Sequence, residues 1–489
     1  MDESGGAPLP NLRSRILIVC GALVLAGLAY AFPLPGISEE GRRLTAVMMV
    51  VVTLWVGEVL PLAVTALLGP ALCVLIGVAK IDQAFAAFGN PIILLFIGSF
   101  LLARVTFKHK LNERIAFRAL SLSIVRSDPT RAFVLLGLTT AALSAWMSNT
   151  AVTAMMLPIA QALLLAMVAG DARAAPPTYA AGLMLIVAYS ASVGGLFTPV
   201  GTPPNLIGIG IIEQATGERV SFLTWVVKIF PITLISLLVM MAYMAFRFRA
   251  ETGRIVYDRT HMATRYAALG PWRVVEKRIA LALLTTATLW IVPPLVPLLD
   301  SAAGAFVTTH LPEAVAPLIA AVPLFWLAEE KGSLRPILEI DDLAAIDWPV
   351  IVLFGGGMCL GQLMMQTGMA KALGTLLALY VPAGHTPAMM FIFCLLAVVV
   401  SETTSNTASA NMVVPVVMAV GAEVGGDPIA FGLAATAACT FGFMLPVSTP
   451  TNAMAYATGY VSQRQMIRWG VVLDIIGVVL LTLWFGYVV

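Results

Sequence analysis

The sequence predicts an all-α polytopic membrane protein, with about eleven spanning helices and two re-entrant hairpins. Of its 489 residues, 60% are hydrophobic and 11% are charged, and the mean hydropathy is +0.94. A soluble globular protein carries about 25% charged residues, so this composition predicts a chain embedded in a lipid bilayer. The net charge of +2 at pH 7 gives no reason to expect a nucleic acid as a partner.

Apolar stretches long enough to cross a bilayer recur along the chain, since a spanning helix needs about 20 such residues. The predicted spanning segments are 15–33, 44–60, 62–79, 91–107, 178–198, 221–246, 279–298, 312–328, 347–363, 428–446 and 467–488. Two further stretches, 132–168 and 386–423, are too long for one helix and hold a polar triplet near the middle. We expect each to form two short helices that meet at a polar tip.

Lysine and arginine counts predict the orientation, because basic loops stay on the cytoplasmic side. Residues 247–278 hold eight basic residues and 108–131 hold six, whereas 372–463 hold none. Counting crossings from these loops places the N-terminus in the cytoplasm and the C-terminus outside, so the two hairpins enter from opposite faces. The short polar N-terminus and the absence of an N-x-S/T sequence favour a bacterial inner (cytoplasmic) membrane.

A two-part motif occurs twice, in the same order. SNTAVTAMMLP begins at Ser148 and SNTASANMVVP begins at Ser405, and each precedes a T-P-x-N stretch, at 202–205 and at 449–452. The matched asparagines are Asn149, Asn205, Asn406 and Asn452. Asn411 has no counterpart in the first motif, and we expect it to make an interhelical hydrogen bond. Duplicated motifs that enter from opposite faces are typical of inverted-repeat secondary transporters, whose site lies on discontinuous helices at the repeat interface.

The residue types in these motifs suit a small cation together with an anion. Prolines at 203, 204 and 450 break helices and leave main-chain groups unpaired. Freed carbonyls, amide oxygens and hydroxyls are ligands suited to sodium, and helix N-termini capped by Ser or Asn favour an anion. Neither motif contains Lys, Arg or His, so dipoles and co-bound cations would offset the anion's charge. The sequence carries no ATPase or hydrolase motif, and we expect no enzymatic activity.

These motifs resemble those of the divalent anion:sodium symporter family, which includes dicarboxylate, citrate and sulfate carriers. The likeness rests on the paired S-N-T stretches, GTPPN at 201–205 and STPTN at 448–452, and it extends to FGNPIILLFIG at 88–98 and AYSASVGG at 188–195. It therefore covers nearly the whole chain. The resemblance implies an elevator-type homodimer that co-transports sodium.

The resemblance also implies a division into scaffold and transport parts. The scaffold would consist of 1–125 and of 251–382, which includes the cytoplasmic loop. The transport parts would be 126–250 and 383–489, each with one hairpin and one broken helix.

By the same resemblance, each hairpin tip and its facing break would form one sodium site, with the substrate between the two sites. The implied sodium ligands are Ser144, Ser148, Asn149 and Gly201 in the first site, and Ser401, Thr404, Asn406 and Ser448 in the second. The implied substrate contacts are Asn149, Thr150, Thr202, Asn406, Thr407, Thr449 and Pro450. Asn205 and Asn452 are expected to stabilise the breaks.

Three acidic residues lie in predicted spanning segments, where an ionisable side chain is a functional hypothesis by default. Glu58 is far in sequence from the motifs, which favours a structural role. Glu402 lies at the second hairpin tip, where it would tune the cation site, or else cap a helix or face water. Asp474 is less well placed. The histidines lie in or beside predicted loops, against a His-based proton relay: His109, His261, His310 and His385.

The sequence therefore predicts a secondary active transporter in a lipid bilayer, for sodium-coupled symport of small divalent anions, with C4-dicarboxylates as the first expectation. Two alternatives on the same fold are a sodium-independent dicarboxylate exchanger and a citrate or sulfate symporter. An anion channel is disfavoured by the inverted repeat with two hairpins. A ligand-binding sensor is disfavoured by the lack of a soluble signalling domain.

Overall fold

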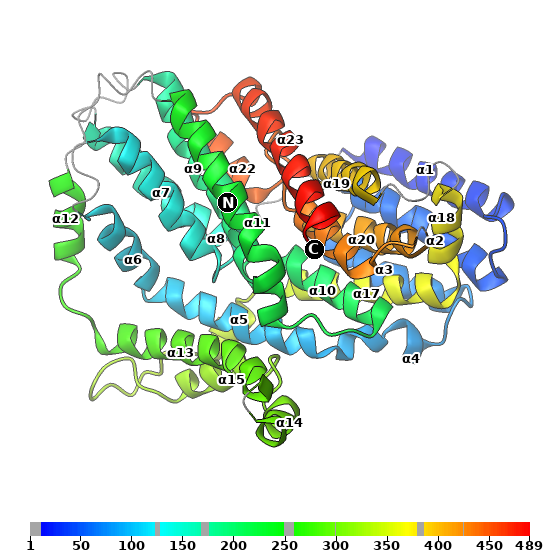
Figure 1. The fold of residues 1–489 in the computed structure, drawn as a ribbon, viewed down its shortest axis with the longest axis horizontal. Coiled ribbons are helices and arrows are strands. Elements are labelled where there is room, and N and C mark those ends of the chain that lie inside the picture. Colours follow the sequence, from blue (N-terminus) through cyan, green and yellow to red (C-terminus); the bar gives the residue numbers. More distant parts are fainter. Residues whose placement is uncertain are drawn as a thin grey trace.

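The described part of the chain consists of helices joined by turns and loops, as Figure 1 shows. The computed structural model describes residues 11–122, 128–167, 176–248, 259–298, 300–378, 386–423 and 425–489. Within these ranges, one isolated bridge between Ala328 and Pro336 is the sole strand-like pairing. The predicted all-α fold is therefore confirmed.

The longer helices are accompanied by short helices and 3₁₀ turns. The helices of 14 residues or more are α1 (Leu12–Ala31), α2 (Glu39–Val56), α3 (Leu62–Leu75), α5 (Pro91–Lys108), α7 (Pro129–Ser144), α8 (Asn149–Met167), α9 (Pro177–Gly194), α10 (Pro203–Thr216), α11 (Phe222–Phe248), α13 (Val274–Ile291), α17 (Trp348–Gln366), α19 (Thr386–Thr403), α20 (Asn406–Glu423) and α23 (Gln463–Tyr487). The shorter elements are α4 (Ile81–Ala84), η1 (Ala86–Gly89), α6 (Leu111–Leu120), η4 (Gly195–Phe197), α12 (Arg259–Ala268), η6 (Pro293–Leu298), α14 (Ser301–His310), α15 (Ala316–Ala321), η7 (Val322–Phe325), α16 (Ile340–Ala344), α18 (Met369–Ala378), α21 (Pro428–Ala438) and α22 (Pro450–Ala457).

Nine helices among the described residues are long and apolar enough to cross a membrane. This count supports an integral membrane protein. Three expected spans end early, and of these the segment 62–79 is helical to Leu75. The segment 312–328 forms α15 and η7, with prolines at 317 and 323 in the first turns of these two elements. The segment 428–446 is helical to Ala438.

The prediction that Glu58 lies within a spanning helix is wrong. Helix α2 ends at Val56, and Glu58 lies in the turn before α3, with a positive φ of 45°. Pro61 precedes α3, and a proline disfavours helical geometry in the residue before it. The expectation that the four histidines lie near loops holds for His109 and His310, which end α5 and α14. His385 lies outside the described residues.

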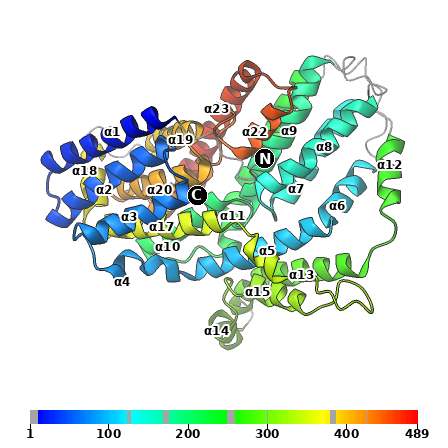
Figure 2. The same cartoon turned by 180° about the vertical axis from the view of Figure 1, so that it is seen from behind.

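The two hairpins lie on opposite sides of α11 and α23 (Figure 1, and from behind in Figure 2). Helices α7 and α8 form the first hairpin, and α19 and α20 form the second. The helix that follows each break packs against the other half: α10 contacts α20 and α21, and α22 contacts α8 and α9. Ser192 Oγ and Thr451 Oγ1, from the two halves, lie 3.4 Å apart. Because each helix after a break packs on the other half, the two breaks lie in the same central region.

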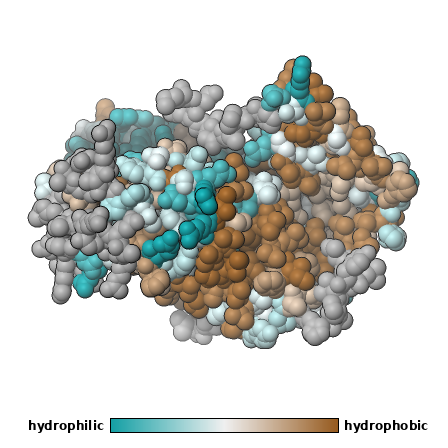
Figure 3. Space-filling model, turned by 90° about the horizontal axis from the view of Figure 1, so that it is seen from above, coloured by the Kyte–Doolittle hydropathy of each residue, from teal (hydrophilic) through white to brown (hydrophobic). Residues whose placement is uncertain are grey.

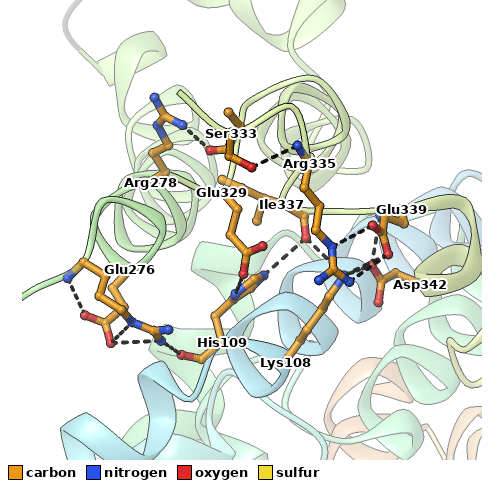
Figure 4. A network of polar contacts seen from close by, with 12 residues as sticks. Lys108, His109, Glu276, Arg278, Glu329, Ser333, Arg335, Ile337, Glu339 and Asp342 are labelled. Carbon is orange, nitrogen blue, oxygen red and sulfur yellow. Dashed lines mark hydrogen bonds and ion pairs between the residues drawn. The ribbon is translucent and has the colours of Figure 1, made fainter. Parts of the chain in front are cut away.

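A polar network joins α5 to the segment before α17, as Figure 4 shows. Lys108 Nζ lies 2.6 Å from Asp342 Oδ2, and His109 Nδ1 lies 3.3 Å from Glu329 Oε1. These two residues at the end of α5 therefore contact a segment more than 200 positions later in the chain. Helix α15 also packs on α5, and α17 packs on α3. Segments far apart in the sequence thus lie side by side in this part of the molecule.

Large apolar side chains cover much of the surface. In the view of Figure 3, a broad hydrophobic area lies beside a hydrophilic band. On α1, Leu17 is 72% exposed and Leu23 is 61% exposed. An exposed helix that is apolar on all sides fits a lipid environment.

Candidate functional site

Each half of the molecule contains a helix break stabilised by an asparagine in the same way. The first break lies between α9 and α10, and the second between α21 and α22. Asn205 Nδ2 donates to the carbonyl oxygens ten and seven residues upstream, at 2.8 and 2.9 Å. Asn452 Nδ2 donates to the carbonyl oxygens at the same two offsets, at 2.8 and 3.1 Å. Both asparagines are fully buried, and the prediction that they stabilise the breaks is confirmed.

The first hairpin tip places its oxygens against the first break. Ser144 Oγ donates to Asn149 Oδ1 at 2.7 Å, and Asn149 Nδ2 donates to Thr202 Oγ1 at 3.4 Å. A Cβ atom on Gly195 would collide with Asn149 Oδ1. A Cβ atom on Gly201 would lie 2.5 Å from the Gly195 carbonyl oxygen and 2.8 Å from that of Ser144. Amide, hydroxyl and carbonyl oxygens therefore converge beside two glycines.

The second hairpin tip repeats this arrangement. Ser401 Oγ lies 2.8 Å from Asn406 Oδ1 and 2.6 Å from the Cys439 carbonyl oxygen. Ser448 Oγ donates to the Gly442 carbonyl at 2.9 Å. A Cβ atom on Gly442 would collide with Ser448 Oγ and would lie 3.5 Å from both Asn406 Oδ1 and Ser401 Oγ. Three side-chain oxygens thus meet beside Gly442.

Two of the implied sodium ligands use their hydroxyl groups within their own hairpins. Ser148 Oγ accepts the N–H of Ala151 at 3.3 Å, in the first turn of α8. Thr404 Oγ1 lies 2.8 Å from both the Val400 carbonyl oxygen and Ser409 Oγ. Both hydroxyls are therefore engaged within their own hairpins.

The implied substrate contacts lie at four helix N-termini. Thr150 and Thr407 are in the first turns of α8 and α20, where Thr150 is exposed and Thr407 is partly exposed. Thr202 and Thr449 are the buried residues that precede α10 and α22, with φ values of −147° and −144°. Pro450 is the exposed first residue of α22. Helix N-termini present unpaired N–H groups and the positive end of the dipole, which suit an anion.

Glu402 contacts the second break directly. Its side chain is 2% exposed, so it does not face water. Its carboxylate accepts the N–H groups of Met444 and Leu445, and Asp474 accepts that of Phe443. Sequence reasoning singled out Glu402 but ranked Asp474 as less well placed, because nothing in the sequence shows that α23 reaches this segment. It also missed the carbonyl of Gly442, which only the matched spacing to Gly195 could have indicated.

Comparison with known proteins shows the family of the chain. Residues 13–489 match the family described as the sodium:sulfate symporter transmembrane region. The chain belongs to this family. Its members are transporters and not enzymes. The prediction that this chain is a membrane transporter without enzymatic activity is therefore confirmed.

Individual members of the symporter family align over nearly the whole chain. A sodium-dependent dicarboxylate transporter, SdcS, of Staphylococcus saprophyticus is 27% identical over 97% of this chain and 91% of its own length. An uncharacterized transporter of Haemophilus influenzae is 30% identical over 97% of both chains. The YdaH transporter of Alcanivorax borkumensis has a solved structure with a TM-score of 0.57 at 14% identity, over 98% of this chain and 99% of that one. This last likeness concerns the fold alone.

Proposed function

We propose that the protein is a sodium-coupled symporter of small divalent anions, with C4-dicarboxylates such as succinate as its substrates. The observation that carries the proposal is the pair of matched oxygen clusters, one beside Gly195 and one beside Gly442. Neutral oxygens suit sodium, and four helix N-termini suit carboxylates. The naming of SdcS as a sodium-dependent dicarboxylate transporter supports this substrate class.

The residues act in three groups in this proposal. The first sodium ion is held by Ser144, Asn149, Ser148 and Gly201, and the second by Ser401, Asn406, Thr404 and Ser448. The Ser148 and Thr404 hydroxyls also have hydrogen-bond partners within their own hairpins. Between the cations, the carboxylates contact Asn149, Thr150, Thr202, Asn406, Thr407, Thr449 and Pro450. The cations offset the charge of the anion, because the motifs themselves hold no basic residue.

Transport would follow an elevator mechanism in a homodimer. The parts 1–125 and 251–382 form the scaffold, supported by the contacts of α15 with α5 and of α17 with α3. The parts 126–250 and 383–489 form the moving body as an inverted repeat, supported by the packing of each post-break helix on the other half. The protein would lie in a bacterial cytoplasmic membrane, with its N-terminus inside and its C-terminus outside, as the basic loops indicate.

Uptake of radiolabelled succinate into proteoliposomes tests this function. The expected result is uptake with an inward sodium gradient and none when potassium replaces sodium. Uptake only into succinate-loaded vesicles, regardless of sodium, would replace symport by exchange. Sodium-driven uptake of citrate or sulfate in place of succinate would change the substrate class and keep the coupling.

A further inference from the structure

Three consecutive main-chain N–H groups in the second break are bound by acidic side chains. Met444 donates to Glu402 Oε1 at 2.6 Å, and Leu445 donates to Glu402 Oε2 at 3.0 Å. Phe443 donates to Asp474 Oδ1 at 3.3 Å. The two acidic side chains are neighbours and are 2% and 3% exposed. Unwound buried backbone needs such acceptors, because an unpaired N–H group costs free energy.

Glu402 connects the two elements that form the second oxygen cluster. It follows Ser401 in the last turn of α19, which leads to the hairpin tip. Its partners follow Gly442, whose carbonyl accepts Ser448 Oγ at 2.9 Å and Asn452 Nδ2 at 2.8 Å. A shift of this segment would therefore move Ser448 relative to Ser401. Ligand distances at a cation site tolerate little such movement.

The corresponding contact between the hairpin and the break in the first half involves no charged side chain. The hairpins are offset by 257 positions (149 to 406) and the breaks by 247 (205 to 452). Ala145 thus stands where the second half has Glu402, and Thr198 stands where it has Leu445. There, Thr198 Oγ1 donates to the Ala145 carbonyl oxygen. In the first half, one hydroxyl thus donates one hydrogen bond between the hairpin and the break. In the second half, one carboxylate accepts two.

We propose that Glu402 is a positioning residue for the second cation site. Together with Asp474 it forms an acidic clamp, in which the two side chains bind the main-chain N–H groups of residues 443–445. Glu402 fixes the distance between the hairpin tip and the second break by holding Met444 and Leu445. Asp474 extends the same clamp to α23 through Phe443. The inference rests on the proposed sodium-coupled function and adds a residue pair that acts on one of its two cation sites.

Sodium dependence of uptake in the Glu402→Gln variant tests the clamp. Glutamine keeps the shape of the side chain but turns one acceptor oxygen into an N–H donor facing a main-chain N–H. The half-saturating sodium concentration is expected to rise at least 10-fold, while Vmax at saturating sodium changes less than 3-fold. Glu423→Gln removes an exposed carboxylate at the end of α20 in the same half, and should leave both values unchanged.

Amide hydrogen exchange provides a second readout that needs no transport. In Glu402→Gln, a peptide covering 441–449 is expected to exchange faster, and to need more sodium for protection, while a peptide covering 194–201 stays unchanged. Unchanged sodium dependence together with unchanged exchange at 441–449 would overturn the proposal.

Two further outcomes are also decisive. If Glu402→Gln does not fold, Asp474→Asn replaces it, with an expected rise of about 3-fold in half-saturating sodium, and no rise overturns the clamp. If wild-type uptake proves independent of sodium, the proposed coupling fails by itself. The clamp then stands or falls on exchange at 441–449 and on the KM for succinate.

Discussion

The two helix breaks share one hydrogen-bonded frame but differ in what supports it. In both, a buried asparagine binds carbonyls ten and seven residues upstream. The first break contains a 3₁₀ turn and is tied to its hairpin by the Thr198 hydroxyl. The second is irregular from 439 to 449 and is held by Glu402 and Asp474. The duplicated part thus gives the two breaks the same frame, and the divergent part holds each break to its surroundings in a different way.

The two breaks also differ in one residue that occupies the same position in each. Gly201 in the first half corresponds to Ser448 in the second, 247 positions later. A Cβ atom on Gly201 would approach the Gly195 carbonyl oxygen to 2.5 Å, whereas the Ser448 hydroxyl donates to the Gly442 carbonyl. The second cluster therefore contains one more side-chain oxygen than the first. The two sites should differ in sodium affinity even though their asparagines match.

The largest expected effect comes from removing the shared asparagine of either half. Asn149→Ala and Asn406→Ala should each reduce succinate uptake about 100-fold or more. Each change removes an oxygen from a cluster, and it removes the partner of Ser144 or one of the two partners of Ser401. A buried polar group left unpaired costs about 1–3 kcal/mol, and the lost ligand adds to this. Initial uptake rates in proteoliposomes measure the effect.

A matched asparagine outside the halves serves as the control. Asn90 caps α5 by accepting the N–H of Ile92 at 2.8 Å, and Asn90→Ser retains such a cap. It should leave uptake unchanged. Near-normal uptake by Asn149→Ala with loss in Asn406→Ala would show that the two halves are not functionally equivalent.

Exchanging the residues at the Gly201 and Ser448 positions should have the next largest effect. Gly201→Ser introduces a Cβ atom into a closely packed region, and overpacking costs about 2 kcal/mol. This corresponds to about 30-fold in sodium affinity. Ser448→Gly loses one hydrogen bond, worth about 1 kcal/mol, or about 5-fold. The measurement is half-saturating sodium for uptake. A larger effect of Ser448→Gly than of Gly201→Ser would show that the Ser448 hydroxyl matters more than the close packing at Gly201.

The sequence allowed both hairpin tips and both breaks to be predicted, because equal spacing within a duplicated motif is a local signal. Asn149, Asn205, Asn406 and Asn452 were all identified in this way. The contact between Glu402 and Asp474 could not be predicted, since it depends on how α23 packs against α19. The end of α2 before Glu58 was also missed, because the apolar stretch continues beyond the residue at which the helix ends.

The second hairpin also has a close contact with α17 that should be sensitive to one methyl group. A Cβ atom on Gly357 would collide with Asn411 Oδ1. The expected interhelical hydrogen bond of Asn411 is not what the structure has: its Nδ2 donates to Thr407 within α20 at 3.0 Å, and its Oδ1 has no partner among the described residues. Gly357→Ala should therefore push the hairpin from α17 and reduce uptake about 10-fold, by about 1.4 kcal/mol.

The double variant distinguishes this collision from a general loss of stability. Gly357→Ala with Asn411→Ala removes the colliding oxygen and should restore most of the uptake, which is the coupling that a double-mutant cycle measures. Gly361→Ala on the same helix has its nearest atoms at 3.9 and 4.0 Å and should behave as wild type. Equal uptake by Gly357→Ala and Gly361→Ala would show that α20 does not depend on this close approach.

The smallest expected difference is between Asn205→Ala and Asn452→Ala. Each substitution leaves two buried carbonyl oxygens without the amide that binds them, at a cost of about 1–3 kcal/mol in the free energy of unfolding. Because the offsets and bond lengths match, the thermal unfolding temperatures of the two variants in detergent should fall by similar amounts.

Sodium should raise these unfolding temperatures less in Asn205→Ala than in Asn452→Ala, since Glu402 and Asp474 still hold the second break. Equal recovery in both variants would mean that the acidic clamp adds nothing to the asparagine, and the two breaks would then be alike in support as well as in frame.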